Sequence, residues 1–272
     1  MVRKSKFLVL FILLLNKLSF GFTLAILSAG NPVEEYKRYK YLSEYLSKSI
    51  NEPVELKIIA KVDQLLSLYE KHKIDMSITC PIVYFELKDR GFNIDAVAVI
   101  KINGQILESG VIVVRKDSDI KTVKDLRDKR VTLGSSICAS NCVMPLYVLS
   151  KEGITYEDIP DLWSSGSDKA AILAVIAGLA DAAGVKEESA LRFIDKGIRI
   201  LVKSPYVPRY VVNLSKNLPE EKTKKIIQAL YHLNDEKTLS ELGIDAFVPP
   251  PAGLFDILKD YKSILNKYPM LR

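Results

Sequence analysis

Residues 131–150 read VTLGSSICASNCVMPLYVLS, and this stretch decides the fold. Val131–Gly134 has the short apolar pattern of a buried strand, and the segment from about Ser140 to Ser150 has helical periodicity. A loop rich in hydroxyls and thiols joins the two. The same order recurs along the chain, beginning with a strand at Phe22–Ser28 and a helix that starts at Pro32. Such alternation predicts an α/β fold whose mostly parallel sheets are covered by helices on both faces.

The loops that follow strands are the predicted ligand-facing segments. In open α/β sheets, ligands bind beyond the carboxyl ends of the strands. The segments at these positions are Ser28–Asn31, Thr79–Tyr84, Gly134–Cys142 and Val185–Glu187.

The loop Gly134–Cys142 is suited to bind an anion. Backbone N–H groups at a helix start favour negative charge, and the helix dipole adds to this preference. The side chains of Ser135, Ser136, Ser140 and Asn141 supply further hydrogen-bond donors. An alternative stays open, in which Ser140 or Asn141 only caps the helix, as Ser and Asn commonly do.

A second polar turn, Ser164–Asp168, also precedes a predicted helix. Its Ser167 or Asp168 either caps that helix or faces the same anion. Lys186 ends the predicted strand that begins at Asp181, and it either supplies a positive charge to the site or is a solvated surface residue. Two helix starts and one lysine are therefore candidates for a shared anion site.

The N-terminal residues 1–21 have the layout of a secretory signal. A basic start is followed by the apolar run Phe7–Leu15, and Ser19 and Gly21 lie at the small-residue positions before a cleavage point. The run is shorter than the roughly 20 residues that cross a bilayer, although a retained anchor remains the alternative. We therefore predict a periplasmic or otherwise extracytoplasmic protein.

The net charge argues against a nucleic-acid partner. The chain has 39 basic and 33 acidic residues, and the leader holds four of the basic residues and no acid. Without the leader, 35 basic residues face 33 acidic ones, a net charge of +2. Nucleic-acid binding requires basic residues clustered on one face, and the sequence has no such cluster.

Three cysteines, Cys80, Cys138 and Cys142, are an odd number for an exported chain, where thiols tend to pair. All three fall on predicted ligand-facing loops. They can be inert core residues, or Cys138 and Cys142 can form a disulfide, although this spacing on a regular helix fits disulfide geometry poorly. The third interpretation is a site for a thiophilic oxyanion such as arsenite or thiosulfate.

Five motifs in order resemble the phosphate/phosphonate-type (PhnD-like) periplasmic solute-binding proteins of ABC transporters, over nearly the whole mature chain. They resemble, in turn, a GPxxY turn, a DLxGKRV element, a Ser-Thr-Ser-Gly anion loop with its proline, a GSH-type turn and an AVxxGxxDAA segment. The corresponding residues are Cys80–Tyr84, Asp125–Val131, Leu133–Pro145, Ser165–Asp168 and Ala174–Ala183.

The resemblance implies a two-lobed periplasmic binding protein of type II, with the ligand between the lobes. It implies that residues 22–108 and 206–272 form lobe 1 and that residues 109–205 form lobe 2. Hinged lobes that close on the ligand would be the mechanism, with no covalent chemistry.

Four departures from the family pattern bear on the ligand. The segment Cys138–Asn141 replaces Ser-Thr-Ser-Gly, and Cys80 replaces a glycine. Asp168 stands where the family often has histidine, and Lys186 stands where an acid is common. A gained lysine suits a ligand without an amino group, whereas Asp168 would repel a dianion unless Lys186 neutralises it.

No catalytic residue, cofactor or metal ligand is predicted. The chain has no P-loop, no GxGxxG after a strand and no HExxH, and Cys138 and Cys142 lack the C-x-x-C spacing of a redox pair. Both histidines, His72 and His232, lie in segments where neither can serve a cysteine nucleophile. An enzyme is therefore not expected.

The predicted function is the capture of a small oxyanion of the phosphate/phosphonate class for an ABC permease, by a monomer. The alternative is an oxyanion sensor for arsenite or a sulfur oxyanion, which uses its cysteines and signals to a membrane histidine kinase. The predicted ligand-binding residues are Cys80, Tyr84, Ser135, Ser136, Cys138, Ser140, Asn141, Cys142, Ser167, Asp168 and Lys186.

Overall fold

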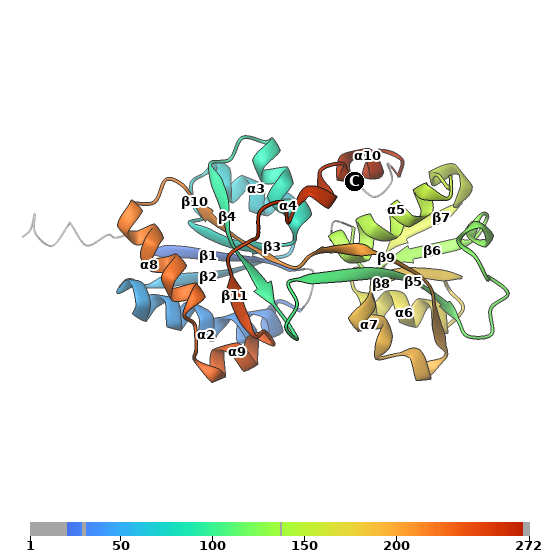
Figure 1. Ribbon diagram of the computed structural model, residues 1–272, viewed down its shortest axis with the longest axis horizontal. Coiled ribbons are helices and arrows are strands. Elements are labelled where there is room, and N and C mark those ends of the chain that lie inside the picture. The colour runs from blue at the N-terminus through green and yellow to red at the C-terminus, as the bar shows by residue number, and fades with distance from the viewer. Residues whose placement is uncertain (1–20, 29–30, 137, 269–272) are drawn as a thin grey trace, which may run out of the picture.

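The computed structural model describes residues 21–28, 31–136 and 138–268. Two lobes of sheet and helix lie side by side along the long axis, and the chain crosses between them (Figure 1). The first lobe contains a six-stranded sheet in the order β11-β4-β10-β3-β1-β2, and the second contains a five-stranded sheet in the order β7-β6-β8-β5-β9. Nearly all of the predicted leader, two residues of the turn Ser28–Asn31, and Ile137 of the anion loop lie outside the described residues.

Each lobe therefore has its own sheet. The strands of the first sheet are β1 (Phe22–Leu27), β2 (Val54–Ile59), β3 (Met76–Thr79), β4 (Ile94–Lys101), β10 (Val211–Ser215) and β11 (Ala246–Val248). The strands of the second sheet are β5 (Leu107–Arg115), β6 (Arg130–Leu133), β7 (Asp161–Ser164), β8 (Ala182–Lys186) and β9 (Ile198–Pro208).

Both sheets are mixed, which corrects the expectation of mostly parallel strands. Parallel pairs join β1 to β2 and β3, and join β6 to β7 and β8. Antiparallel pairs join β10 to β3 and β4, β11 to β4, and β5 to β8 and β9. The reason lies in the crossings, because β4 continues into β5 and β9 into β10 through short links. A parallel pair of strands within one sheet needs a long crossover connection. At the two crossings the chain instead leaves one sheet and enters the other directly, from β4 into β5 and from β9 into β10.

The helices begin largely where the sequence predicts them. Asn31 caps the first described helix by accepting from the N–H groups of Val33 and Glu34, and Pro32 occupies its first turn. The helices are α2 (Pro32–Ile50), α3 (Val62–Glu70), α4 (Pro81–Asp89), α5 (Met144–Lys151), α6 (Asp168–Ile176), α7 (Glu187–Leu191), α8 (Glu220–Tyr231), α9 (Glu236–Leu242) and α10 (Tyr261–Asn266). Shorter turns are η1 (Val123–Leu126), η2 (Ala139–Val143), η3 (Tyr156–Asp158), η4 (Ile194–Lys196) and η5 (Asp256–Leu258).

No helix among the described residues has both the length and the apolar composition that a membrane span requires. The predicted helix of about 140–150 is present, but it begins with the wider π-type turn η2 before continuing as α5.

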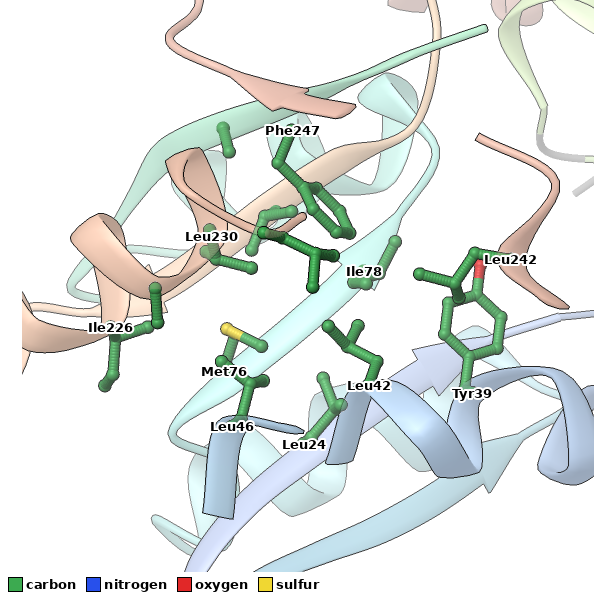
Figure 2. Packing of buried hydrophobic residues seen from close by; sticks show 14 of the residues in the cluster. Leu24, Tyr39, Leu42, Leu46, Met76, Ile78, Ile226, Leu230, Leu242 and Phe247 are labelled. Atoms are coloured by element: carbon green, nitrogen blue, oxygen red, sulfur yellow. The ribbon is translucent and has the colours of Figure 1, made fainter. Parts of the chain in front are cut away.

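One apolar core holds α2, α8 and α9 against the first sheet (Figure 2). Leu42 and Leu46 of α2 are fully buried with Leu24 and Met76 of the sheet. Each such side chain contributes roughly 1.5–3 kcal/mol by leaving water. Tyr39 lies one turn earlier on the same face of α2, so this packing also fixes the N-terminal end of α2 beside the second lobe.

A second apolar cluster is shared by both lobes, and we call it the apolar side of the lobe interface. Ile82 and Val83 come from α4 in the first lobe, and Val143 and Met144 come from η2 and α5 in the second. Residues that follow β11 complete it, and α10 lies between the lobes beside α5 (Figure 1). Hydrophobic burial therefore joins the lobes along this side.

The C-terminal segment contacts both lobes. Tyr261 packs in the apolar side, whereas Tyr268 is fully buried in the core of the second lobe. The Tyr268 hydroxyl hydrogen-bonds to the carbonyl oxygens of Ile154 (2.7 Å) and Leu146 (3.3 Å). The end of the described chain is thus attached to the second lobe, after β11 has completed the first sheet.

Candidate ligand-binding site

A cavity of about 360 Å³ lies between the lobes and adjoins the apolar side, with which it shares Cys80 and Cys138. The first lobe contributes the end of β1 and one face of α2, and the second contributes the loop after β6, the start of α6 and the end of β8. These are the strand ends and helix starts that the α/β rule selects. The cavity has the size of a small-molecule site.

A buried group of charges centred on Glu108 forms part of the cavity wall. The Glu108 carboxylate accepts from Lys186 Nζ (3.2 Å), from Arg209 Nη1 (3.3 Å) and from the Ser140 hydroxyl (2.5 Å). Arg209 also pairs with Glu188 through its other terminal nitrogen. Buried charges are stable only when they are paired and hydrogen-bonded, and here each charge has a partner.

The charge of Lys186 is held in place by its surroundings. Burial alone would lower the pKa of Lys186, but the Glu108 carboxylate and the neighbouring Tyr210 outweigh burial and raise the pKa well above its usual value. Lys186 Nζ also lies 4.8 Å from the centroid of the Tyr210 ring. The lysine is therefore a permanent cation, but Glu108 already balances its charge.

Asp168 connects three segments of the second lobe. Its carboxylate accepts from Asn141 Nδ2 (2.7 Å), from the Ser189 hydroxyl (2.7 Å) and from the backbone N–H of Lys186 (3.4 Å). A Cβ at Gly134 would lie 2.0 Å from an Asp168 oxygen, so this position requires glycine. Asp168 thus links three segments by hydrogen bonds: the loop after β6, the start of α6 and the end of β8.

Of the two capping alternatives, the structure supports one. Ser167 caps α6 by accepting from the N–H of Ala170 (3.2 Å), as the sequence allowed. Ser140 makes no side-chain cap for η2 or α5; it is fully buried, and its hydroxyl donates to Glu108. Ser140 is therefore a member of the buried charged group and does not cap a helix.

The cavity wall is not positively charged overall. Among the described residues that line it, Arg38, Lys186 and Arg209 are cationic, and four residues are acidic, which gives a formal charge of −1. The four acidic residues are Glu35, Glu108, Asp168 and Glu188. An anion that enters must therefore be held by directed hydrogen bonds rather than by excess positive charge.

Two buried polar atoms in the wall are unsatisfied. Arg209 Nε, a donor, and Asn141 Oδ1, an acceptor, have no hydrogen-bond partner among the described residues. Both residues line the cavity and are about nine-tenths buried or more. A buried unpaired polar atom costs about 1–3 kcal/mol, so a rearrangement of the wall that gave these two atoms partners would be favourable.

Seven of the eleven sequence-predicted residues line the cavity, and four do not. Tyr84 packs against Phe255 near the apolar side, with ring centroids 5.5 Å apart. Cys142 is fully buried in the core of the second lobe, where burial raises the pKa of its thiol. Ser136 and Ser140 are not among the residues that line the cavity. The seven are Cys80, Ser135, Cys138, Asn141, Ser167, Asp168 and Lys186.

Sequence reasoning missed the residues that the first lobe and the crossings contribute. Glu35, Arg38 and Tyr39 share one face of α2, and their 3–4 spacing was the available signal. Arg38 is positioned by donating to the carbonyl of Leu242 (2.6 and 3.0 Å). The other charged or aromatic residues that were missed are Glu108, Glu188, Arg209 and Tyr210.

The fold is shared with solved structures of binding proteins. The structure of PhnD1 from Prochlorococcus marinus in complex with methylphosphonate matches with a TM-score of 0.78 at 17% identity, covering 90% of this chain and 98% of that one. A binding protein component of an ABC phosphonate transporter from Pseudomonas aeruginosa matches with a TM-score of 0.76 at 16% identity, covering 92% and 88%. The aliphatic sulphonate binding protein SsuA from Escherichia coli matches with a TM-score of 0.62 at 16% identity, covering 92% and 93%.

A family model described as "ABC transporter, phosphonate, periplasmic substrate-binding protein" matches residues 24–252. This description supports the predicted transport function, the extracytoplasmic location and the absence of enzyme activity, and it does not favour the sensing alternative. The type II fold is confirmed as well. The chain belongs to the family of periplasmic substrate-binding proteins of phosphonate ABC transporters.

Proposed function

We propose that this protein binds a small phosphonate in the cavity between its lobes and presents it to an ABC permease. The observation that carries the proposal is the pair of unsatisfied atoms, Arg209 Nε and Asn141 Oδ1. A phosphonate offers anionic oxygens that accept from Arg209 and, when it carries a P–OH or an ammonium group, a donor for Asn141. Burial of both atoms strengthens these hydrogen bonds.

The charges of the wall favour a phosphonate that also carries a cationic group. Lys186 is already balanced by Glu108, so its presence no longer indicates a ligand without an amino group. The formal charge of −1 disfavours a dianion and suits a zwitterion such as an aminoalkylphosphonate. We therefore propose 2-aminoethylphosphonate as the first ligand to test, with methylphosphonate as its comparison.

Calorimetric titration of the mature protein with 2-aminoethylphosphonate, methylphosphonate, phosphate and sulfate tests the proposal. Arg209→Lys keeps the positive charge but removes Nε, so we expect it to weaken phosphonate binding by about tenfold or more, equivalent to one charge-assisted hydrogen bond. Arg38→Lys is the matched control, because Arg38 lines the same cavity but donates to Leu242. Equal affinity for sulfate and both phosphonates, or an unaffected Arg209→Lys variant, would contradict the proposal.

Three further expectations belong to this proposal. Residues 1–21 would be removed on export, which N-terminal sequencing of the secreted protein tests. The protein would act as a monomer, which light scattering tests. The lobes, predicted as 22–108 with 206–272 and as 109–205, would move as units, except that the end of the described chain at Tyr268 would move with the second lobe. Hydrogen exchange with and without 2-aminoethylphosphonate tests these bounds.

A further inference from the structure

Cys80 and Cys138 come from different lobes and meet at the cavity wall. Cys80 follows β3 and precedes α4 in the first lobe, and Cys138 follows β6 and precedes η2 in the second. Both are in the thiol form and line the cavity, with 5% and 8% of their surfaces exposed. The two cysteines share one apolar cluster and one cavity wall, and a hydrogen bond links their thiol groups.

The pair lies at the boundary between the two sides of the lobe interface. Both cysteines belong to the shared apolar cluster, and both also line the polar cavity. Because each cysteine directly precedes a helix or helical turn, a covalent bond between them would join the start of α4 to the start of η2. Those two segments belong to different lobes.

The two thiols differ in chemistry in a way that suits disulfide exchange. The hydrogen bond from Cys138 lowers the pKa of Cys80 against the effect of burial, and the N–H groups of Val83, Ile82 and Ala139 lower it further. The pKa of Cys138 is raised well above its usual value by the hydrogen bond to Cys80 and by burial. Because Cys80 also lies at the N-terminus of α4, where the helix dipole favours a thiolate, we assign it as the first nucleophile and Cys138 as the second.

We infer that Cys80 and Cys138 form a redox-sensitive cross-link site, at which a disulfide joins the two lobes beside the ligand cavity. The inference goes beyond solute binding, because it does not depend on which solute is bound. The required oxidant is an external disulfide, which oxidising extracytoplasmic compartments supply. Cys142 is excluded from the site because it is buried in the core of the second lobe.

The reaction is two successive thiol–disulfide exchanges. The Cys80 thiolate attacks one sulfur of the external disulfide, which forms a mixed disulfide and releases one thiolate. Cys138 then gives up its proton to the released thiolate and attacks the Cys80 sulfur, which forms the bond between the lobes and releases the second thiolate, which takes a proton from water. Two protein thiols are oxidised by two electrons, and one external disulfide is reduced to two thiols.

The cross-link would restrict separation of the lobes. A disulfide that closes a long loop stabilises the folded state by constraining the unfolded chain, and this one encloses residues 80–138. Both thiols are nearly buried, so an external disulfide reaches Cys80 when the lobes separate. The oxidised protein should therefore exchange its ligand more slowly than the reduced protein.

The test is oxidation of the wild-type mature protein in buffers of reduced and oxidised glutathione. Remaining thiols are trapped with N-ethylmaleimide under denaturing conditions, and the products are mapped by mass spectrometry. We expect a mass lower by two hydrogen atoms, a linked peptide pair containing Cys80 and Cys138, and a melting temperature raised by about 5 °C or more. Cys142→Ala should form the same link, whereas Cys80→Ser and Cys138→Ser should not.

Alkylation of both Cys80 and Cys138 in the wild type after the most oxidising buffer would overturn the inference, and so would a link that contains Cys142. Both outcomes are measured on the wild-type protein, so they do not depend on whether a variant folds. A Cys80–Cys138 link that forms in protein unable to bind either 2-aminoethylphosphonate or methylphosphonate would support the inference, while it counts against the proposed phosphonate function alone.

Discussion

The lobe interface has two sides that differ in chemistry. On the apolar side, aliphatic and aromatic groups from α4, α5 and the C-terminal segment share one buried cluster. On the polar side, Glu108, Lys186 and Arg209 form a buried charged group around a cavity with two unsatisfied atoms. Separation on the apolar side exposes hydrocarbon to water, at about 25 cal/mol per Å².

Separation of the lobes costs less free energy on the polar side, because water can then solvate the charged side chains that the separation exposes. The two sides therefore have different roles. The apolar side buries hydrocarbon between the lobes, and the polar side is where we propose that the ligand binds. Variants on each side should affect stability and binding to different extents.

Removing the central acid should have the largest effect on the polar side. Glu108→Gln leaves two buried cations without their shared carboxylate, so we expect a loss of about 3–5 kcal/mol in the free energy of unfolding. Urea unfolding measures it. Glu220→Gln is the control, because its pair with Lys224 is exposed and should change stability by about 0.5 kcal/mol or less. A Glu108→Gln variant as stable as this control would show that the charged group is not needed for folding.

A cavity on the apolar side should destabilise the protein with less effect on binding. Met144 is 1% exposed within the shared cluster, so Met144→Ala should cost about 2–3 kcal/mol of unfolding free energy. Affinity for 2-aminoethylphosphonate, measured by calorimetry below the melting temperature, should stay close to that of the wild type. A loss of affinity as large as that of Arg209→Lys would remove the distinction between the two sides.

The attachment of the C-terminal segment should have a smaller effect. Tyr268→Phe removes a buried hydroxyl that contacts two carbonyl oxygens, so we expect a loss of about 1–2 kcal/mol in unfolding free energy. Hydrogen exchange should also increase in α10 before it increases in α2. Tyr36→Phe is a suitable control, since Tyr36 is 48% exposed. Unchanged exchange in α10 would argue against Tyr268 as its anchor.

The smallest effect should come from a tyrosine on the polar side at high pH. Burial raises the pKa of Tyr39 to about 12 in the folded protein, whereas an unfolded tyrosine ionises near pH 10. The unfolded chain therefore loses this proton first, and stability is constant below about pH 10 and falls as the pH rises toward 12. At pH 11 the wild type should lose about 1 kcal/mol that Tyr39→Phe does not lose. Parallel pH profiles of the two proteins would contradict this assignment.

Local signals in the sequence predicted much of the fold and part of the site. Asn31 and Pro32 mark the start of α2, and the structure confirms it, because a cap and a first-turn proline act through neighbouring atoms. The segments after β6 and β8 were expected to face the ligand, and Ser135 and Lys186 line the cavity. These positions follow from strand ends, which local patterns locate.

Cys138 and Cys142 show the limit of prediction from local sequence patterns. The two residues lie on the same predicted loop, but Cys138 lines the cavity, while Cys142, one turn later, enters the core of the second lobe. Cys142 lies within the π-type turn η2, and Cys138 directly precedes it. Sequence periodicity assumes a regular helix and therefore does not distinguish their environments.

The sequence by itself determined the α/β class, the helix starts and the loops that follow strands, because each depends on residues close together in the chain. Only the tertiary structure decided the mixed sheets, the pairing of Glu108 with Lys186 and Arg209, and the contact of Cys80 with Cys138. Those features join residues far apart in the sequence. They depend on how the chain crosses between its two lobes, and no local pattern encodes that path.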